Sequence, residues 1–102
     1  MTGFSFKSTH VLPIERPERY VKQLNSHLAN KAELYEGFLL FQDLGAGEAE
    51  PLDNKIQLTA YSDSEEGLNK IQNILAKHLY KFAKVTDQDP IWNLEKKNVN
   101  NN

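Results

Sequence analysis

An apolar stripe at helical spacing, late in the chain, constrains the fold more than any other sequence feature. Apolar residues recur there every three or four positions, at Leu68, Ile71, Leu75, Leu79 and Phe82. This spacing places them on one side of an α-helix, which must bury that side against another element. Ser62 or Asp63 can cap the helix, and the stripe ends near Ala83. We therefore predict a long amphipathic helix there.

A second helix is predicted earlier in the chain, over residues 19–31. Its apolar side is formed by Tyr20, Val21, Leu24, His27 and Leu28. Pro17 suits the first turn of a helix, because the N–H group that proline lacks would have no hydrogen-bond acceptor within the helix at that position. Each predicted helix thus carries a histidine, His27 or His78, on its apolar side.

The rest of the chain predicts strands. Residues 4–12 alternate, so that Phe4, Phe6, Ser8, His10 and Leu12 share one face. Residues 55–61 alternate in the same way, and residues 34–44 predict one or two short strands broken at Gly37. Residues 85–94 predict a closing strand with Pro90 at an edge or bulge. The glycine-rich segment 45–51 predicts a flexible connection.

This order predicts an α+β two-layer sandwich, with two helices on one face of a mainly antiparallel sheet. Residues 1–94 would form the single domain, and the polar residues 95–102 a disordered tail. A shift of 51 positions superposes identical residues, at Glu15/Glu66, Leu24/Leu75, His27/His78, Leu28/Leu79 and Ala32/Ala83. These matches are consistent with an internal duplication of a strand–helix–strand unit, which would make His27 and His78 pseudo-equivalent.

Composition excludes several kinds of protein. The 102 residues suffice for one core, and the formal net charge of -2 does not favour nucleic acid or anionic membranes as partners. The absence of cysteine excludes disulfides, thiolate metal sites and cysteine nucleophiles. The first residues lack the apolar run of a signal peptide, so we expect a cytoplasmic protein.

The histidines are the main candidates for chemistry, because imidazole titrates near neutral pH and is the commonest metal ligand. His10, His27 and His78 all lie on predicted apolar faces. Three converging imidazoles would suit zinc or iron. The other interpretation is that each ring lies at the margin of the core and hydrogen-bonds a carbonyl or carboxylate. Arg16, Arg19, His27 and Lys31 could also form an anion pocket, or merely a solvated flank.

The run Arg19-Tyr20-Val21-Lys22-Gln23-Leu24, with His27 and Lys31 after it, resembles the bacterial family known as domain of unknown function 2218. The later segment His78-Leu79-Tyr80-Lys81-Phe82-Ala83, followed by Trp92, resembles the same family. The similarity covers roughly residues 6–94. Asn30 stands where the family often has a second histidine, which leaves Arg19, His27, Lys31 and His78 as polar matches.

The resemblance implies an accessory role in the use of ferric siderophores, since similar domains occur alone or fused to flavin-dependent siderophore-interacting reductases. We therefore expect a non-enzymatic domain that binds a small molecule or such a reductase through Arg19, His27, Lys31 and His78. The alternative is a small histidine-dependent metalloprotein or enzyme. No cofactor, nucleic acid or membrane is expected as a partner.

Overall fold

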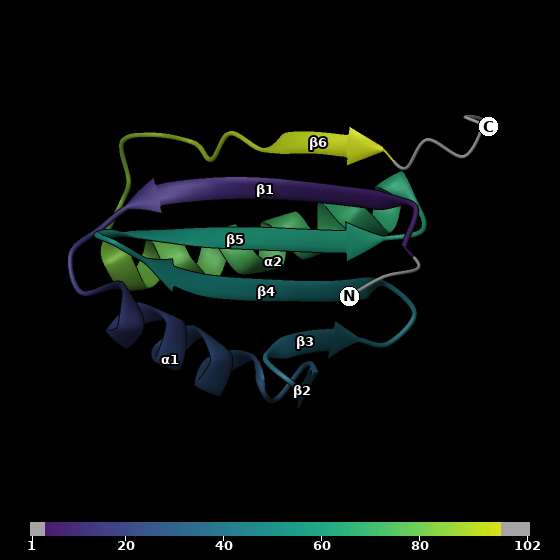
Figure 1. Ribbon diagram of the computed structural model, residues 1–102, viewed down its shortest axis with the longest axis horizontal. Coiled ribbons are helices and arrows are strands. Elements are labelled where there is room, and N and C mark those ends of the chain that lie inside the picture. The colour runs from purple at the N-terminus through teal and green to yellow at the C-terminus, as the bar shows by residue number, and fades with distance from the viewer. Residues whose placement is uncertain (1–3, 97–102) are drawn as a thin grey trace.

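The computed structural model describes residues 4–96 of the chain (Figure 1). The elements follow the order β1 (Phe6–Pro13), α1 (Pro17–Leu28), β2 (Glu33–Tyr35), β3 (Phe38–Phe41), β4 (Gly45–Leu52), β5 (Lys55–Ser62), α2 (Glu65–Ala83) and β6 (Asn93–Lys96). No helix within these residues is long and apolar enough to span a bilayer.

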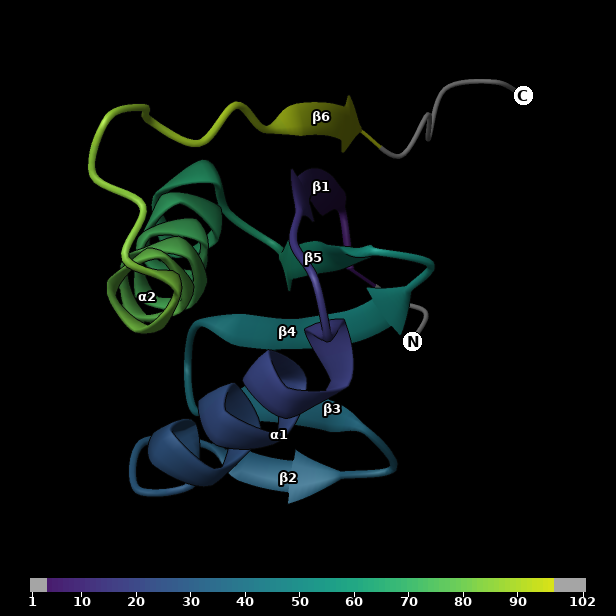
Figure 2. The ribbon, with the colours of Figure 1, turned by 90° about the vertical axis from the view of Figure 1, so that its left-hand side faces the viewer.

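The strands form one six-stranded sheet in the order β2-β3-β4-β5-β1-β6, and neighbouring strands are antiparallel. Both helices lie on the same side of this sheet (Figure 2). The predicted α+β two-layer fold is therefore confirmed. The fold contains two strand–helix–strand units, β1-α1-β4 and β5-α2-β6. The two units interlock in the sheet, because β5 lies between β1 and β4, and β1 lies between β5 and β6. This is the split β-α-β arrangement of ferredoxin-like folds, with the β2–β3 hairpin added at one edge.

The alternation predicted for the first strand is present in β1. Ser8, His10 and Leu12 are buried beneath the helices, whereas Lys7 and Val11 are exposed on the other face. The strand begins at Phe6 and not at Phe4. The Phe4 ring instead lies against Tyr61, with 6.0 Å between ring centroids.

The prediction of a flexible connection over residues 45–51 was wrong. These residues form β4, which lies inside the sheet between β3 and β5. Gly47 and Ala49 are buried on the helix-covered face, and a Cβ atom on Gly47 would lie 3.0 Å from Cδ1 of Leu75 in α2. Small residues such as Gly47 have a low preference for strands, which is why the sequence did not predict one here. The same small size lets α2 pack closely against β4.

The helices differ from the predictions at their ends. α1 starts at Pro17, as its sequence predicts, but ends at Leu28 rather than Lys31. The N–H groups of Lys31 and Ala32 both donate to the Leu28 carbonyl, in a turn that closes the helix. The cap of α2 is Ser64, whose Oγ accepts from the Gly67 N–H at 3.0 Å, and not Ser62 or Asp63.

The closing strand is shorter and later than predicted. Residues 85–92 form no strand, and β6 comprises only Asn93–Lys96, paired with β1. The polar run from Asp87 to Asp89, followed by Pro90, offers little apolar surface for a sheet position. Glu95 and Lys96, predicted to begin a disordered tail, pair with Lys7 and Phe6. The remainder of that predicted tail, 97–102, lies outside the described residues.

One hydrophobic core holds the two layers together. Leu24 and Leu28 from α1 and Leu75 and Leu79 from α2 are fully buried within it. The 51-position shift superposes these leucines in pairs. In the sheet, Ser8 pairs with Ala60 and Thr9 with Thr59. The same shift carries Ser8 to Thr59 and Thr9 to Ala60, so the β1–β5 register is consistent with a twofold relation between the two units.

Candidate functional site

The fold brings two histidines together, one from each helix. The ring centroids of His27 in α1 and His78 in α2 lie 4.8 Å apart, with 47° between the ring planes. These are the positions that the 51-residue shift relates. We refer to His27 and His78 as the histidine pair.

The histidine pair lies on the outer side of the contact between the helices. Each histidine immediately precedes a fully buried leucine, Leu28 or Leu79. One residue turns the helix by about 100°, which moves the imidazole from the core to its margin. His27 is exposed and His78 is half-buried. The expectation that His27 faces away from water was therefore wrong. Core leucines fill the space between the helices and the sheet.

The orientation of His78 is set by a backbone hydrogen bond. Its Nδ1 lies 2.7 Å from the carbonyl oxygen of Ile74, one turn earlier in α2. A carbonyl oxygen only accepts, so Nδ1 carries the proton and donates. In the neutral ring the lone pair is then on Nε2. Phe82 completes the surroundings, since its ring centroid lies 5.4 Å from that of His27 in an edge-to-face arrangement and 6.4 Å from that of His78.

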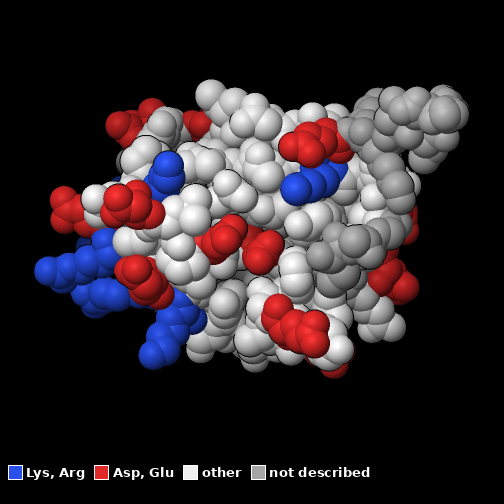
Figure 3. All heavy atoms as spheres, in the orientation of Figure 1, with Lys and Arg blue, Asp and Glu red and all other residues white. Residues whose placement is uncertain are grey.

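The predicted cationic residues do not join the histidine pair in one pocket. Arg19 is exposed and precedes His27 by eight residues, a rise of about 12 Å along α1. Lys31 is exposed beyond the end of α1 and lines a separate hollow of about 550 Å³. Arg16 precedes α1, so the helix separates it from Lys31 by about 18 Å. Lys and Arg side chains gather toward the end of the molecule where α1 lies (Figure 3).

His10 is held apart from the histidine pair in a network of its own. Its Nδ1 lies 3.0 Å from the Ile91 carbonyl oxygen, and its Nε2 lies 2.7 Å from the Tyr80 hydroxyl. Trp92 lies beside the ring, with 5.5 Å between centroids. Both ring nitrogens are used, so the hypothesis of three converging imidazoles was wrong. Within residues 4–96, no group of three or more His, Cys, Asp or Glu side chains could hold a metal ion.

Burial determines the protonation states in this network. Burial lowers the pKa of His10, and the hydrogen bond to Ile91 opposes that shift only in part. The neutral ring therefore donates from Nδ1 to Ile91 and accepts at Nε2 from the Tyr80 hydroxyl. Burial, and then the charge of Asp89, raise the pKa of Tyr80, which keeps the phenol protonated as that donor. The arrangement suits a structural link better than an activated acid or base.

Sequence reasoning did not identify Tyr80, Ile91 or Phe82 as partners of the histidines. The one available signal was that a histidine on the inner face of a strand needs a hydrogen-bond partner. The partners of His10 lie 70 and 81 positions further along the chain, and no local pattern indicates them.

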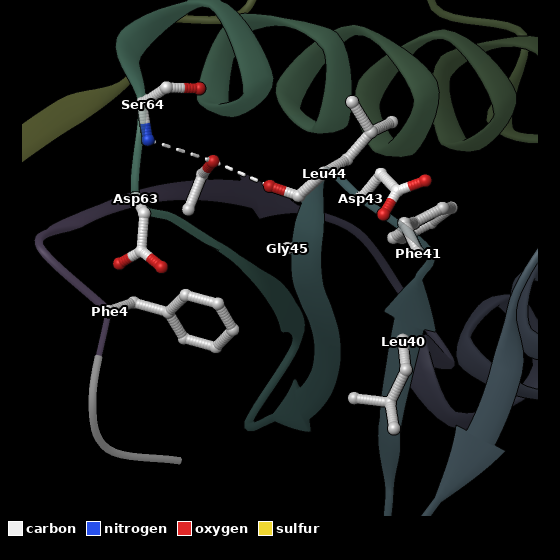
Figure 4. Close-up of a pocket in the computed structure, with 9 residues that line it drawn as sticks. Phe4, Leu40, Phe41, Asp43, Leu44, Gly45, Asp63 and Ser64 are labelled. Atoms are coloured by element: carbon white, nitrogen blue, oxygen red, sulfur yellow. Dashed lines mark hydrogen bonds between the residues drawn. The ribbon is translucent and has the colours of Figure 1, made fainter.

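A hollow of about 410 Å³ lies where the β3–β4 turn meets the start of α2, and none of the predicted site residues lines it (Figure 4). Ser62 Oγ donates to the Leu44 carbonyl at 2.5 Å and accepts from the Ser64 N–H at 3.3 Å. Asp43 and Asp63 add negative charge there. The polar groups at this helix start therefore satisfy each other.

The fold and the site define a small α+β domain with paired imidazoles on adjoining helices. The family model described as "Uncharacterized protein conserved in bacteria (DUF2218)" matches residues 9–93, and the chain belongs to this family. The predicted resemblance is thereby confirmed. The chain is also similar to a solved structure, "NMR structure of PA4090 from Pseudomonas aeruginosa". The TM-score is 0.73 at 28% identity, covering 86% of this chain and 95% of that one. No curated protein matches the chain.

Proposed function

We propose that this protein is a non-enzymatic binding domain of the bacterial cytoplasm that accompanies the use of ferric siderophores. The histidine pair is its central contact, and Arg19 and Lys31 attract an anionic chelate. The observation that carries the proposal is the 4.8 Å approach of two imidazoles from separate helices. The resemblance to domains fused to flavin-dependent siderophore reductases supports the iron setting.

The chemistry of the pair suits such a ligand. Iron chelates present oxygen donors and planar groups at their surface. Nitrogen-bound protons of imidazole can donate to such oxygens, and the edges of His27 and Phe82 offer an apolar contact. The exposed charges of Arg19 and Lys31 attract an anion at longer range, most strongly at low salt, because the screening length of about 8–10 Å at moderate ionic strength grows as the salt concentration falls. A reductase surface that presents the chelate is the second partner this arrangement would suit.

Nuclear magnetic resonance of the imidazoles tests the proposal. A gallium(III) siderophore chelate replaces the ferric one, because gallium is diamagnetic and leaves the ring signals sharp. We expect the His27 and His78 signals to shift on titration, while buried His10 stays unchanged as an internal control. Shifts confined to other residues, or no shifts with either a catecholate or a hydroxamate chelate, would contradict the proposal.

Charge variants sharpen the test. Arg19→Gln and Lys31→Gln should each weaken chelate binding at low salt and have little effect at high salt, where screening removes the attraction. Lys7→Gln, an exposed residue near the start of β1 on the sheet face that the helices leave uncovered, is the control. If the control variant weakened chelate binding equally, the affinity would depend only on the net charge of the protein and not on the positions of Arg19 and Lys31.

The second candidate function is that of a histidine-dependent metalloprotein or enzyme. One observation favours it: the backbone bond of His78 leaves its Nε2 free to coordinate a metal ion.

A further inference from the structure

We propose that the histidine pair is a two-imidazole site for a borderline divalent transition-metal ion of the Zn²⁺ and Cu²⁺ class. This inference shares with the proposed function only the two side chains, His27 and His78, that contact the ligand. It needs neither a siderophore nor a reductase.

The separation of the rings fits a shared ion. With metal–nitrogen bonds of about 2.05 Å and about 1.15 Å from nitrogen to ring centre, two imidazoles on a tetrahedral ion have centroids about 5.2 Å apart. With a nitrogen–metal–nitrogen angle of about 90°, the same lengths place the centroids about 4.5 Å apart. The observed 4.8 Å lies between these values.

The surroundings of His78 are those of a metal ligand. Histidines that bind metals commonly donate their second N–H to a carbonyl or carboxylate, which fixes the tautomer and the ring orientation. The 2.7 Å bond from Nδ1 of His78 to the Ile74 carbonyl provides this contact. Within residues 4–96, no hydrogen bond occupies a ring nitrogen of His27. Both partners therefore retain a nitrogen for coordination.

The donor set indicates the class of metal. Imidazole suits Zn²⁺, Cu²⁺, Ni²⁺ and Fe²⁺, whereas Mg²⁺ and Ca²⁺ require several oxygen ligands. No third His, Cys, Asp or Glu completes the site among the described residues. Water or the donor atoms of a bound molecule would occupy the remaining positions. Since His27 is exposed, the ion and such a molecule can reach the site directly from solvent.

Titration of the full chain, purified without a histidine tag, tests this inference. Calorimetry with Zn²⁺ should give one site per chain, and the imidazole signals of His27 and His78 should change while those of His10 do not. Cu²⁺ should bind more tightly than Zn²⁺, and Mg²⁺ should produce no change. Zinc binding that perturbs His10 or other residues in place of the histidine pair would overturn the inference.

Single substitutions supply the decisive comparison. His27→Gln and His78→Gln should each lower Zn²⁺ affinity by tenfold or more, whereas Ser26→Ala, the exposed neighbour of His27, should leave it unchanged. Circular dichroism establishes that each variant is folded, and His27→Gln alone decides the question if His78→Gln unfolds. A loss of less than tenfold in the folded His27→Gln variant would overturn the metal site.

The two proposals fail separately. Zinc binding by the pair without any response to the gallium chelate would refute the siderophore role and leave the metal site intact. A response to the chelate without zinc binding would refute the metal site alone.

Discussion

At the scale of single residues, the three histidines have two different environments. His10 is 6% exposed and uses both ring nitrogens for hydrogen bonds. His27 and His78 lie at the margin of the core, with nitrogens left for a ligand. Burial converts the imidazole of His10 into a structural group, because an uncharged ring with two partners costs little in the interior.

The lowered pKa of His10 predicts acid sensitivity. In the unfolded chain histidine binds a proton near pH 6.5, whereas the folded state resists protonation. Below about pH 6.5 the unfolded state therefore binds more protons, and the free energy of unfolding falls as the pH drops. Urea denaturation at pH 7.5, 6.5 and 5.5 should show a steeper loss for the natural protein than for His10→Gln.

Equal pH slopes in the two proteins would contradict this assignment. If His10→Gln does not fold, the His10 ring signal in the natural protein provides the check, since it should titrate below pH 6.5.

Part of the site could be predicted at this scale. Alternation along residues 4–12 correctly indicated that His10 faces the core, and helical spacing placed His27 and His78 beside buried leucines. Whether a ring at the edge of an apolar stripe is covered depends on the neighbouring element, which a single helix does not reveal. That is why His27 was expected on the side of α1 that faces away from water and is exposed.

At the scale of elements, β4 shows how packing overrides local preference. Glycine, alanine, glutamate and proline disfavour strands, and the segment is a sheet strand nonetheless. β5 pairs with it on one side and β3 on the other, and Leu75 of α2 packs against Gly47.

Substitution of Gly47 tests this packing. Gly47→Val should destabilise the protein by about 1–3 kcal/mol in urea denaturation, because the new side chain meets buried Leu75. The double variant with Leu75→Ala should lose less than the sum of the two single costs, since the smaller side chain makes room.

Glu50→Val is the matched control for this experiment. Glu50 is an exposed residue in the same strand, and valine there should change stability by no more than about 0.5 kcal/mol. Strictly additive costs of Gly47→Val and Leu75→Ala would show that the two residues are not in contact.

At the scale of the whole molecule, the segment after α2 is attached through His10. Ile91 accepts from its ring, Trp92 lies beside that ring, and Tyr80 donates from α2. This contact joins α2, β1 and the approach to β6, which are distant in sequence.

Trp92 should therefore contribute strongly to stability. Trp92→Ala should cost about 2–3 kcal/mol, near the low end for large aromatic truncations because Trp92 is only partly buried. Ile91→Ala is the matched control: its side chain is 77% exposed, and its carbonyl bond to His10 survives the substitution. Similar costs for the two variants, measured by urea denaturation, would contradict this role.

The amino-acid sequence by itself determined the two helical stripes, the alternation of the β1 and β5 strands and, from these, the two-layer class. These features depend on periodicity within a few residues, so neighbouring positions suffice to reveal them. Only the tertiary structure decided that β4 is a strand, that His10 bonds Tyr80 and that His27 meets His78. Each of these depends on surfaces that folding brings together from distant positions, where shape and burial outweigh local propensity.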